Sequence, residues 1–285
     1  MTPLKQYLII IKSLLFFLFD CIALWKTPSP QKNQLEVVLL IRQDAIGDFV
    51  MWLDSAKEYR QLYPPDKYKI VLVGNIIWCD LAKVLPYWDD VLAVNVKQFK
   101  TFSRYRVNLL RQVCNLGAKI AVQPTFSREF YHGDSLVRAS NAFRKVSSVG
   151  DMSNRNWLKK TLANGWHTEL IPASVQMMTE LERNAEFFQG LSDKPHKIFY
   201  PKLELPQIVT SSNWENREYY VLFPGVSAAF RQWPIESFAE IADRIYDATG
   251  LNGILDGAPN EKLLSKSIQD LAKAPLDWAG TRLAE

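Results

Sequence analysis

The sequence predicts an α/β fold with two domains, each built on a parallel β-sheet flanked by helices. Two segments support this prediction, Ile41–Asp48 in the first half of the chain and Phe223–Pro234 in the second. Each follows a run of β-branched and aliphatic residues and leads into a helical pattern. A strand, a small-residue loop and a helix form the arrangement at which α/β sheets bind ligands. We therefore expect one ligand site in each half, with the two domains facing each other across a cleft.

The sequence predicts a membrane-associated helix followed by a linker at the N-terminus, over residues 1–30. Tyr7–Trp25 is apolar apart from Lys12 and Asp20 and has nearly the length of a spanning helix. A cleaved signal peptide is not expected, because no small-residue cleavage site follows. We expect residues 5–25 to lie in the membrane interface with the lysines toward the headgroups. A single-pass anchor and a helix packed on the protein's own core are the alternatives.

The first domain is expected over residues 35–205, where apolar strands alternate with helices. The run at 35–41 is apolar apart from Glu36, as a buried parallel strand should be. The expected strands are 35–41, 69–73, 91–96, 119–122 and 145–149. The expected helices are 49–63, 77–85, 102–116, 135–143 and 175–189. This alternation predicts a parallel sheet.

The second domain is expected over residues 218–285, after a connection at 201–218 that is rich in proline, serine and charge. The expected strands are 219–223 and 253–255, and the expected helices are 235–249 and 261–272. The last residues resemble the first turn of another helix, with Thr281 as its cap. About two strand–helix units are fewer than a doubly wound domain usually needs, so we expect a truncated chain.

Composition excludes few functions. The chain has 285 residues, enough for two cores, and its 48% hydrophobic and 22% charged residues are ordinary for a globular protein. The net charge of +4 fits an anionic ligand or a membrane surface, and ordinary variation explains it equally well. No arginine-rich run is present, so nucleic acid is not expected as a partner. The scattered cysteines indicate a reducing compartment, and the isolated histidines form no metal motif.

The first loop carries two carboxylates next to a glycine. Gly47 allows a tight turn and a close approach of backbone to ligand. Asp48 falls at the start of a helix, where it either caps the helix or takes a proton from a substrate hydroxyl. Asp44 has the same two interpretations, and Arg42 either serves an anionic substrate or pairs with Asp44. The loop has neither a Walker A pattern nor three spaced glycines, which argues against an NTPase and against an NAD-dependent oxidoreductase.

The second loop offers groups that suit a diphosphate. Backbone N–H groups around Gly225, the hydroxyl of Ser227 and the cation of Arg231 could hold it together. A plain strand-to-helix turn is the alternative. Glu261, after the next strand, either caps its helix or reaches a ribose hydroxyl.

Together these segments resemble the family 9 glycosyltransferases, the bacterial lipopolysaccharide heptosyltransferases. The motifs shared with that family are Ala45–Asp48, Pro224–Ser227, Arg231–Pro234, Gly257–Glu261 and Asp277–Thr281. Ser127–Phe130, and the stretch from there through Gly150 and Asp151, also look like some members. The resemblance covers roughly residues 35–285 and depends on the order and spacing of the motifs.

The resemblance implies a GT-B fold, in which two Rossmann-like domains enclose the active site. It implies an inverting transfer of a sugar, typically heptose from ADP-heptose, onto a lipopolysaccharide-core or related lipid-linked oligosaccharide acceptor. Asp48 would be the general base, with Gly47, Arg42 and Asp44 on the acceptor side. Ser227, Arg231 and Gly225 would hold the donor diphosphate, and Glu261 would contact its ribose. The family usually has lysine at position 231. The nucleotide sugar is a substrate, and neither a cofactor nor a metal is expected.

One departure from the family concerns the donor site. The family carries a later Asp-x-Gly-x-x-His segment beside the donor phosphates, and the sequence ends before it. A non-catalytic, membrane-associated relic or fragment without a complete donor site is therefore the alternative function. The expected location is cytoplasmic, peripheral on the inner face of the bacterial inner membrane. Basic residues of the first domain suit a phosphorylated lipid acceptor or form a solvated helix face. They are Lys97, Lys100, Arg104, Arg106 and Arg111.

Overall fold

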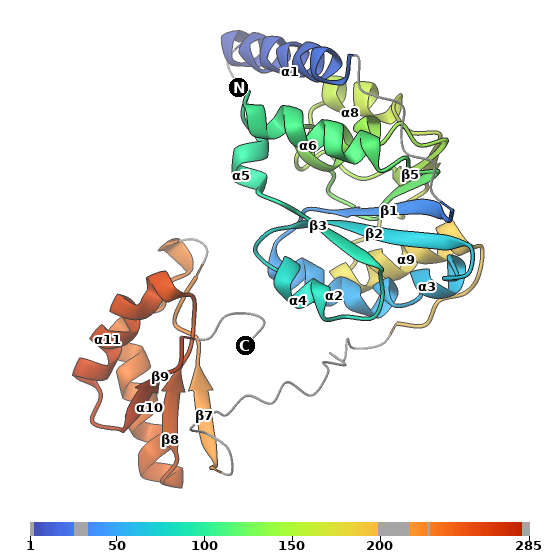
Figure 1. Ribbon diagram of the computed structural model, residues 1–285. Coiled ribbons are helices and arrows are strands. Elements are labelled where there is room, and N and C mark those ends of the chain that lie inside the picture. Colours follow the sequence, from blue (N-terminus) through green and yellow to red (C-terminus); the bar gives the residue numbers. More distant parts are fainter. Residues whose placement is uncertain (1–2, 26–33, 199–216, 227–228, 281–285) are drawn as a thin grey trace. The chain divides into compact units, whose positions relative to one another are not determined.

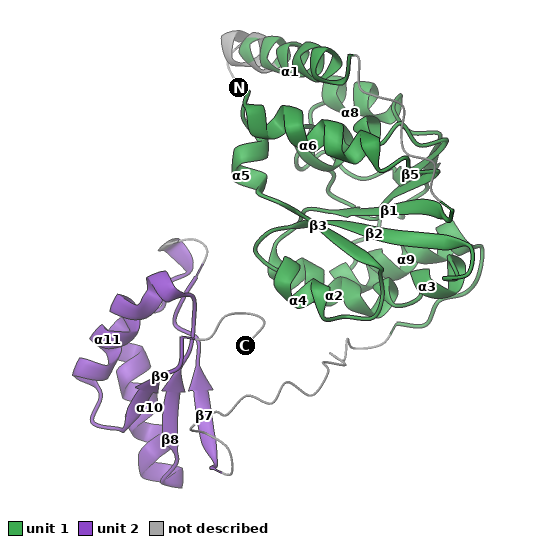
Figure 2. Ribbon diagram, viewed as in Figure 1, with its two compact units in different colours: residues 1–205 green, residues 206–285 purple. Residues whose placement is uncertain are grey.

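The computed structural model describes residues 3–25, 34–198, 217–226 and 229–280. The chain divides into two compact units, residues 1–205 and 206–285 (Figure 2). The boundary falls inside the predicted connection at 201–218. The two units are described separately.

Unit 1 contains a six-stranded, fully parallel sheet with strand order β3-β2-β1-β4-β5-β6. Its strands are β1 (Glu36–Arg42), β2 (Tyr68–Asn75), β3 (Asp90–Val94), β4 (Ile120–Gln123), β5 (Arg144–Ser148) and β6 (Glu169–Ile171). The order reverses direction between β1 and β4, which lie side by side with Leu40 opposite Val122. This is the strand order of a Rossmann-like domain, whose ligands bind at the carboxyl ends of the strands next to that reversal.

Helices cover both faces of this sheet (Figure 1). α2 (Ile46–Ala56), α3 (Tyr59–Leu62), α4 (Cys79–Lys83) and α9 (Glu180–Ser192) lie on one face. The other face carries α1 (Pro3–Leu24), α5 (Val96–Phe99), α6 (Arg104–Asn115), α7 (Ser135–Ala139) and α8 (Trp157–Asn164). Along β1, Val38 and Leu40 pack with the first group, and Leu39 and Ile41 with the second. Burial on both faces explains why the strand is apolar throughout Val37–Ile41, between the charged residues at its two ends.

Several predicted helices have different bounds in the structure. The helix predicted at 49–63 is two helices, α2 and α3. The helix predicted at 175–189 begins only at Glu180, because Thr179 and Glu182 form a capping box. The helix predicted at 135–143 ends at Ala139, and Asn141 then takes a left-handed backbone conformation (φ 49°). The π-helical turn η1 (Phe130–Asp134), α8 and β6 were not predicted.

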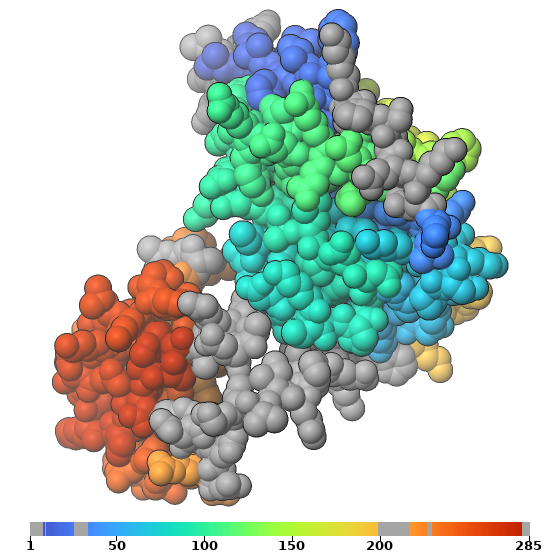
Figure 3. Space-filling view, viewed as in Figure 1, coloured from blue at the N-terminus to red at the C-terminus, as the bar shows by residue number. Residues whose placement is uncertain are grey.

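Helix α1 packs onto unit 1 instead of standing apart from it. Its inner face buries Ser13, Phe16 and Asp20, and the Asp20 carboxylate receives two hydrogen bonds from Arg106 in α6. The arrangement matches the predicted alternative of a helix packed on the protein's own core. The outer face is exposed and apolar, and Figure 3 shows α1 at the surface of unit 1 beside α6. None of the described helices has the length and apolar content to cross a bilayer.

Unit 2 contains a three-stranded parallel sheet of order β7-β8-β9. Its elements are β7 (Tyr219–Leu222), η2 (Ala229–Arg231), α10 (Ile235–Thr249), β8 (Asn252–Leu255), η3 (Pro259–Glu261), α11 (Lys262–Leu271) and β9 (Leu276–Trp278). The predicted helix at 235–249 is confirmed, and Gly250 ends it in a left-handed conformation (φ 71°). The predicted cap Thr281 lies outside the described residues.

Candidate functional site

A polar pocket of about 220 Å³ lies at the carboxyl ends of β1 and β4 in unit 1. Asp44 and Asp48 line it from the loop and helix that follow β1, and Thr125 from the loop after β4. Glu129 and Lys100 are also part of its lining. The pocket lies where the strand order reverses, which is the usual ligand-binding position in folds of this kind.

Arg42, the last residue of β1, holds this loop and does not reach the pocket. Its guanidinium is fully buried and forms ion pairs with Asp44 (2.9 Å) and with Glu180 in α9 (2.6 Å). It also donates hydrogen bonds to Asn184 Oδ1 (2.7 Å) and to the Asp48 backbone carbonyl (3.2 Å). Of the two predicted roles, the structure shows the pairing with Asp44. Arg42 is a positioning residue, because its contacts fix both carboxylate-bearing positions.

Asp44 is held by several partners. Besides Arg42, Thr125 Oγ1 donates to its carboxylate (3.0 Å). Its backbone carbonyl accepts hydrogen bonds from Trp78 Nε1 (2.9 Å) and Asn75 Nδ2 (3.2 Å). A carboxylate with an ion pair and a hydrogen bond is a poorer candidate for proton transfer than Asp48.

Asp48 lies in the first turn of α2 and half-buried at the pocket. The Ala45 backbone N–H donates to its carboxylate, so the predicted capping role is present. Burial, and next the negative charge of Asp44, raise the pKa of Asp48 above its ordinary value, while Arg42 opposes the shift. A carboxylate with a raised pKa is a better proton acceptor than one with an ordinary pKa. Capping and proton transfer are therefore compatible in this residue.

The structure gives Gly47 a different explanation from the predicted tight turn. Gly47 lies inside α2, is not among the glycines with positive φ, and a Cβ there would meet no atom within 4 Å. Its side therefore opens onto free space beside the pocket-lining aspartate. The predicted close approach of a ligand to the backbone fits this position, whereas a conformational requirement does not.

The opposite wall of the pocket comes from Glu129 and the turn η1. Burial raises the pKa of Glu129, while Lys100 and Lys159 oppose that shift. His132 also lines the pocket, and burial lowers its pKa to about 3, with Lys100 and Arg106 adding to the effect. His132 is therefore neutral at physiological pH and does not add a positive charge to the site.

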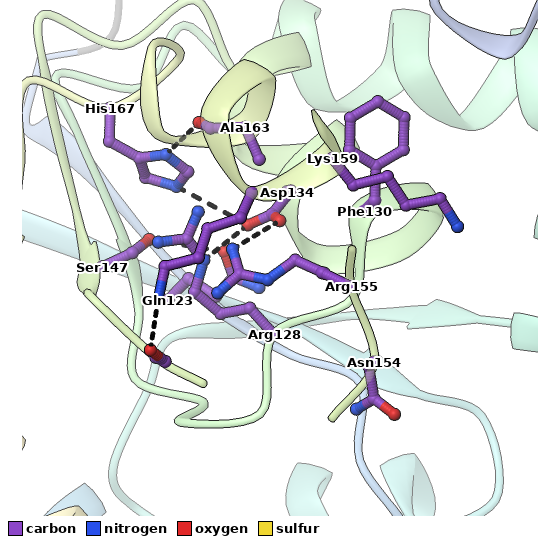
Figure 4. A network of polar contacts seen from close by, with 12 residues as sticks. Gln123, Arg128, Phe130, Asp134, Ser147, Asn154, Arg155, Lys159, Ala163 and His167 are labelled. Carbon is purple, nitrogen blue, oxygen red and sulfur yellow. Dashed lines mark hydrogen bonds and ion pairs between the residues drawn. The ribbon is translucent and has the colours of Figure 1, made fainter. Parts of the chain in front are cut away.

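A buried ionic cluster supports this wall (Figure 4). Arg128 and Arg155 both reach Asp134, the last residue of η1, at 2.8 Å and 3.4 Å. Arg128 also donates to the Ser148 carbonyl at the end of β5 (2.6 Å), and all three charged side chains are fully buried. The cluster joins the loop after β4 to the loop after β5, so it fixes the backbone on both sides of Glu129.

The donor-side residues predicted in unit 2 are partly brought together. Glu261 accepts a hydrogen bond from the Ala258 N–H (2.8 Å), which is the predicted cap. The same carboxylate lies against the backbone of Gly225 and Gly257, where any Cβ would collide with it. Arg231 is exposed, and its guanidinium lies 5.4 Å from the centre of the Phe230 ring. Ser227 lies outside the described residues.

Solved structures with a similar fold include three bacterial proteins. E. coli heptosyltransferase WaaC with ADP-2-deoxy-2-fluoro heptose has a TM-score of 0.65 at 16% identity, with 87% of this chain and 77% of that chain covered. The glycosyl transferase family 9 protein from Veillonella parvula DSM 2008 has a TM-score of 0.62 at 11% identity, with 90% of this chain and 73% of that chain covered. E. coli ADP-heptose LPS heptosyltransferase II has a TM-score of 0.56 at 14% identity, with 88% of this chain and 74% of that chain covered.

The chain has the fold of the family 9 glycosyltransferases. The predicted family resemblance and the predicted GT-B class are thereby confirmed as a fold. The sequence matches no protein-family profile and no curated protein. The residue roles that the resemblance implied remain predictions.

Within this family 9 fold, the sequence prediction missed the wall opposite Asp48. Glu129, Thr125 and His132 follow β4. The available signals were their position after a predicted strand and the resemblance of Ser127–Phe130 to some family members, neither of which singled out these side chains. The predicted basic surface also needs a correction, because Arg106 is fully buried and paired with Asp20. Arg111 donates to the Ala23 carbonyl of α1 (2.8 Å). Of that set, only Lys100 lines the pocket.

A larger hollow of about 690 Å³ lies between α9 and the segment Asp193–Ile198. None of the predicted site residues lines it, and it is not at the β1–β4 reversal. Among the described residues, no group of His, Cys, Asp and Glu side chains is arranged to hold a metal ion. The β1–β4 pocket is therefore the candidate active site of unit 1.

Proposed function

We propose that the protein is an inverting glycosyltransferase that moves a sugar from a nucleotide diphosphate onto a lipid-linked acceptor. The main support for this proposal is the half-buried carboxylate of Asp48, which has a raised pKa and lines the pocket where the strand order reverses between β1 and β4. The fold supports the reaction type, since similar structures include heptosyltransferases solved with ADP or an ADP-heptose analogue. We accordingly propose heptose from ADP-heptose as donor and a lipopolysaccharide-core or related oligosaccharide as acceptor.

The proposed reaction is a single displacement. Asp48 takes the proton of an acceptor hydroxyl while the hydroxyl oxygen forms a bond to the anomeric carbon of the donor. The bond from that carbon to the diphosphate oxygen breaks, and the nucleotide diphosphate leaves with the electron pair. Arg231 and Ser227 would stabilise the charge on that leaving group, and arginine can bind two of its oxygens at once. Glu261 would accept a hydrogen bond from the ribose beside Gly225.

We also propose that α1 holds the protein at the inner face of the bacterial inner membrane, on the cytoplasmic side. Its outer face exposes a continuous apolar strip, comprising Leu8, Ile11, Leu14, Leu15, Leu18, Ile22 and Trp25. Two cations flank α1, Lys12 beside the Tyr131 ring and Arg138 over the Phe17 ring. An apolar face with basic flanks is the pattern of a helix lying in the interface of an anionic membrane.

The donor site is tested by the thermal stability of the protein with ADP, UDP, GDP and ADP-heptose. Ligand binding to the folded state raises the stability by about 2.7 kcal/mol at a concentration one hundred times the Kd. We expect ADP and ADP-heptose to stabilise the protein, and Arg231→Ala to weaken their binding about tenfold or more. Arg244→Ala is the matched control, since Arg244 is exposed on α10 and paired with Glu240. Binding of none of these nucleotides would favour the alternative of a relic without a complete donor site.

A further inference from the structure

The buried guanidinium of Arg42 is shared between the Asp48 loop and helix α9. On the loop side, Nε lies 2.9 Å from the Asp44 carboxylate, and Nη2 donates to the backbone carbonyl of Asp48 (3.2 Å). On the α9 side, Nη1 donates to Asn184 Oδ1 (2.7 Å) and Nη2 to Glu180 Oε1 (2.6 Å). Each nitrogen of this cation therefore faces an oxygen, and α9 supplies two of those oxygens.

The Nη2 group is the part of Arg42 that lies next to Asp48. It contacts the Asp48 backbone carbonyl, so the side chain of the same residue is within reach of it after a change of rotamer. In the part of the chain that the structure describes, the Asp48 carboxylate forms no ion pair, because Nη2 is bound to Glu180. An opposite charge beside a carboxylate favours its ionised form and weakens it as a proton acceptor. Glu180 therefore occupies the donor group that would otherwise pair with the proposed base.

Helix α9 is fixed against α2, so Glu180 has a defined place. The capping box of Thr179 and Glu182 begins the helix at Glu180. Further along α9, Phe187 and Phe188 belong to the same buried apolar cluster as Trp52 of α2. The Trp52 ring also packs against Arg42, with its centre 5.3 Å from the guanidinium carbon. Apolar packing thus holds the two helices and the cation between them in one arrangement.

Three carboxylates surround this one cation, and their charges act on each other. Burial, together with the charges of Asp44 and Asp48, raises the pKa of Glu180, while Arg42 opposes the shift. A charge interaction is mutual, so ionised Glu180 also disfavours ionisation of Asp48. The other titratable groups that line the pocket with Asp48 are Lys100, Glu129 and the neutral His132.

We propose that Glu180 and Asn184 of α9 are positioning residues for Asp48, which act by binding Arg42 so that the Asp48 carboxylate stays free for an acceptor hydroxyl. The inference rests on the proposed glycosyltransferase function and adds two residues that do not line the pocket. Asn184 fixes the direction of the guanidinium, and its side-chain amide also donates to the Met51 carbonyl of α2 (3.5 Å). Glu180 supplies the charge that balances Arg42.

The pKa of Asp48 tests this inference without substrate. It is measured by carboxyl-carbon NMR on the full-length protein, with the signal assigned by its loss in Asp48→Asn. Glu180→Gln removes a negative charge from Arg42 and should lower the pKa of Asp48 by about half a unit or more. Asn184→Asp adds a charge to the same guanidinium and should raise it, and the double variant should return close to the parent value. Asp193→Asn is the matched control, because it removes an exposed carboxylate at the opposite end of α9, where asparagine tolerates the left-handed backbone.

A purely structural role for Glu180 would not produce shifts of opposite sign that cancel in the double variant. If Glu180→Gln and Asn184→Asp both leave the pKa of Asp48 at the value of Asp193→Asn, the inference is overturned, whether or not the protein transfers sugar. In a transfer assay, Glu180→Gln should lower kcat about tenfold with the KM for ADP-heptose unchanged, and Asn184→Asp in the same chain should restore it. If the pKa shifts occur and no nucleotide sugar supports transfer by the parent, the transferase proposal fails and the role of α9 in holding Arg42 stands.

Discussion

Replacing Asp20 by alanine should destabilise unit 1 strongly, because it leaves Arg106 as a buried charge without a partner. Arg106 donates to both Asp20 oxygens (2.6 and 2.7 Å), and both side chains are almost completely buried. Its remaining N–H groups donate to the carbonyls of Phe99 and Tyr131 and to Ser135 Oγ. Removing one partner of a buried pair costs about 3–5 kcal/mol, a large share of the usual 5–15 kcal/mol for folding.

Native-state hydrogen exchange measures this loss where it occurs. The amides of α6 and of η1 should open with a free energy lower by about 3–5 kcal/mol in Asp20→Ala, because Arg106 holds α1 and η1 together. Asp20→Leu combined with Arg106→Met should recover most of the loss, since no charge is then left unpaired. Arg104→Ala, two residues away and exposed, should stay within about 0.5 kcal/mol of the parent. If Asp20→Ala behaves like Arg104→Ala, α1 is not docked through this pair in solution and the reasoning is wrong.

Two other predictions concern the pocket and the membrane. Transfer needs ionised Asp48, so kcat/KM should fall as the pH drops through its raised pKa. Asp44→Asn removes one cause of the shift, and the acidic limb of the pH profile should move to lower pH; a limb that stays in place would show that Asp48 is not the titrating base. Replacing Ile11, Leu15 and Leu18 together by serine should abolish sedimentation with anionic vesicles and keep the fold, because these side chains are exposed; undiminished sedimentation would exclude α1 as the membrane contact. These variants test the contact better than deletion of α1, which would also leave Arg106 unpaired.

Most of the fold could be predicted from the sequence, because the hydrophobic pattern of a strand or helix is a local property of the chain. The central strand β1 is apolar throughout Val37–Ile41 because helices cover both of its faces, so the strand could be predicted from the sequence alone. Asp48 could be placed for the same reason, since a loop after a parallel strand lies at the ligand-binding edge. The helix at 235–249 was predicted with its end, because Gly250 takes the left-handed conformation that stops it.

The parts that could not be predicted depend on contacts between distant residues. Arg42 is a buried positioning residue because of Glu180 and Asn184, which lie more than a hundred residues further along the chain. Asp20 was assigned to a membrane surface because Arg106, its partner, lies in another helix. Glu129 precedes a π-helical turn that has no hydrophobic period to reveal it. Pairings of this kind are tertiary, and no local pattern records them.

The most direct test of the central claim is a transfer assay that compares the parent protein with Asp48→Asn. The assay follows release of ADP from ADP-heptose in the presence of lipopolysaccharide acceptors, together with the Kd for ADP. The account predicts that Asp48→Asn retains the parent Kd for ADP and loses transfer by at least about a hundredfold, the usual contribution of a general base. Parent-level turnover by Asp48→Asn would contradict the assignment of this carboxylate as the base.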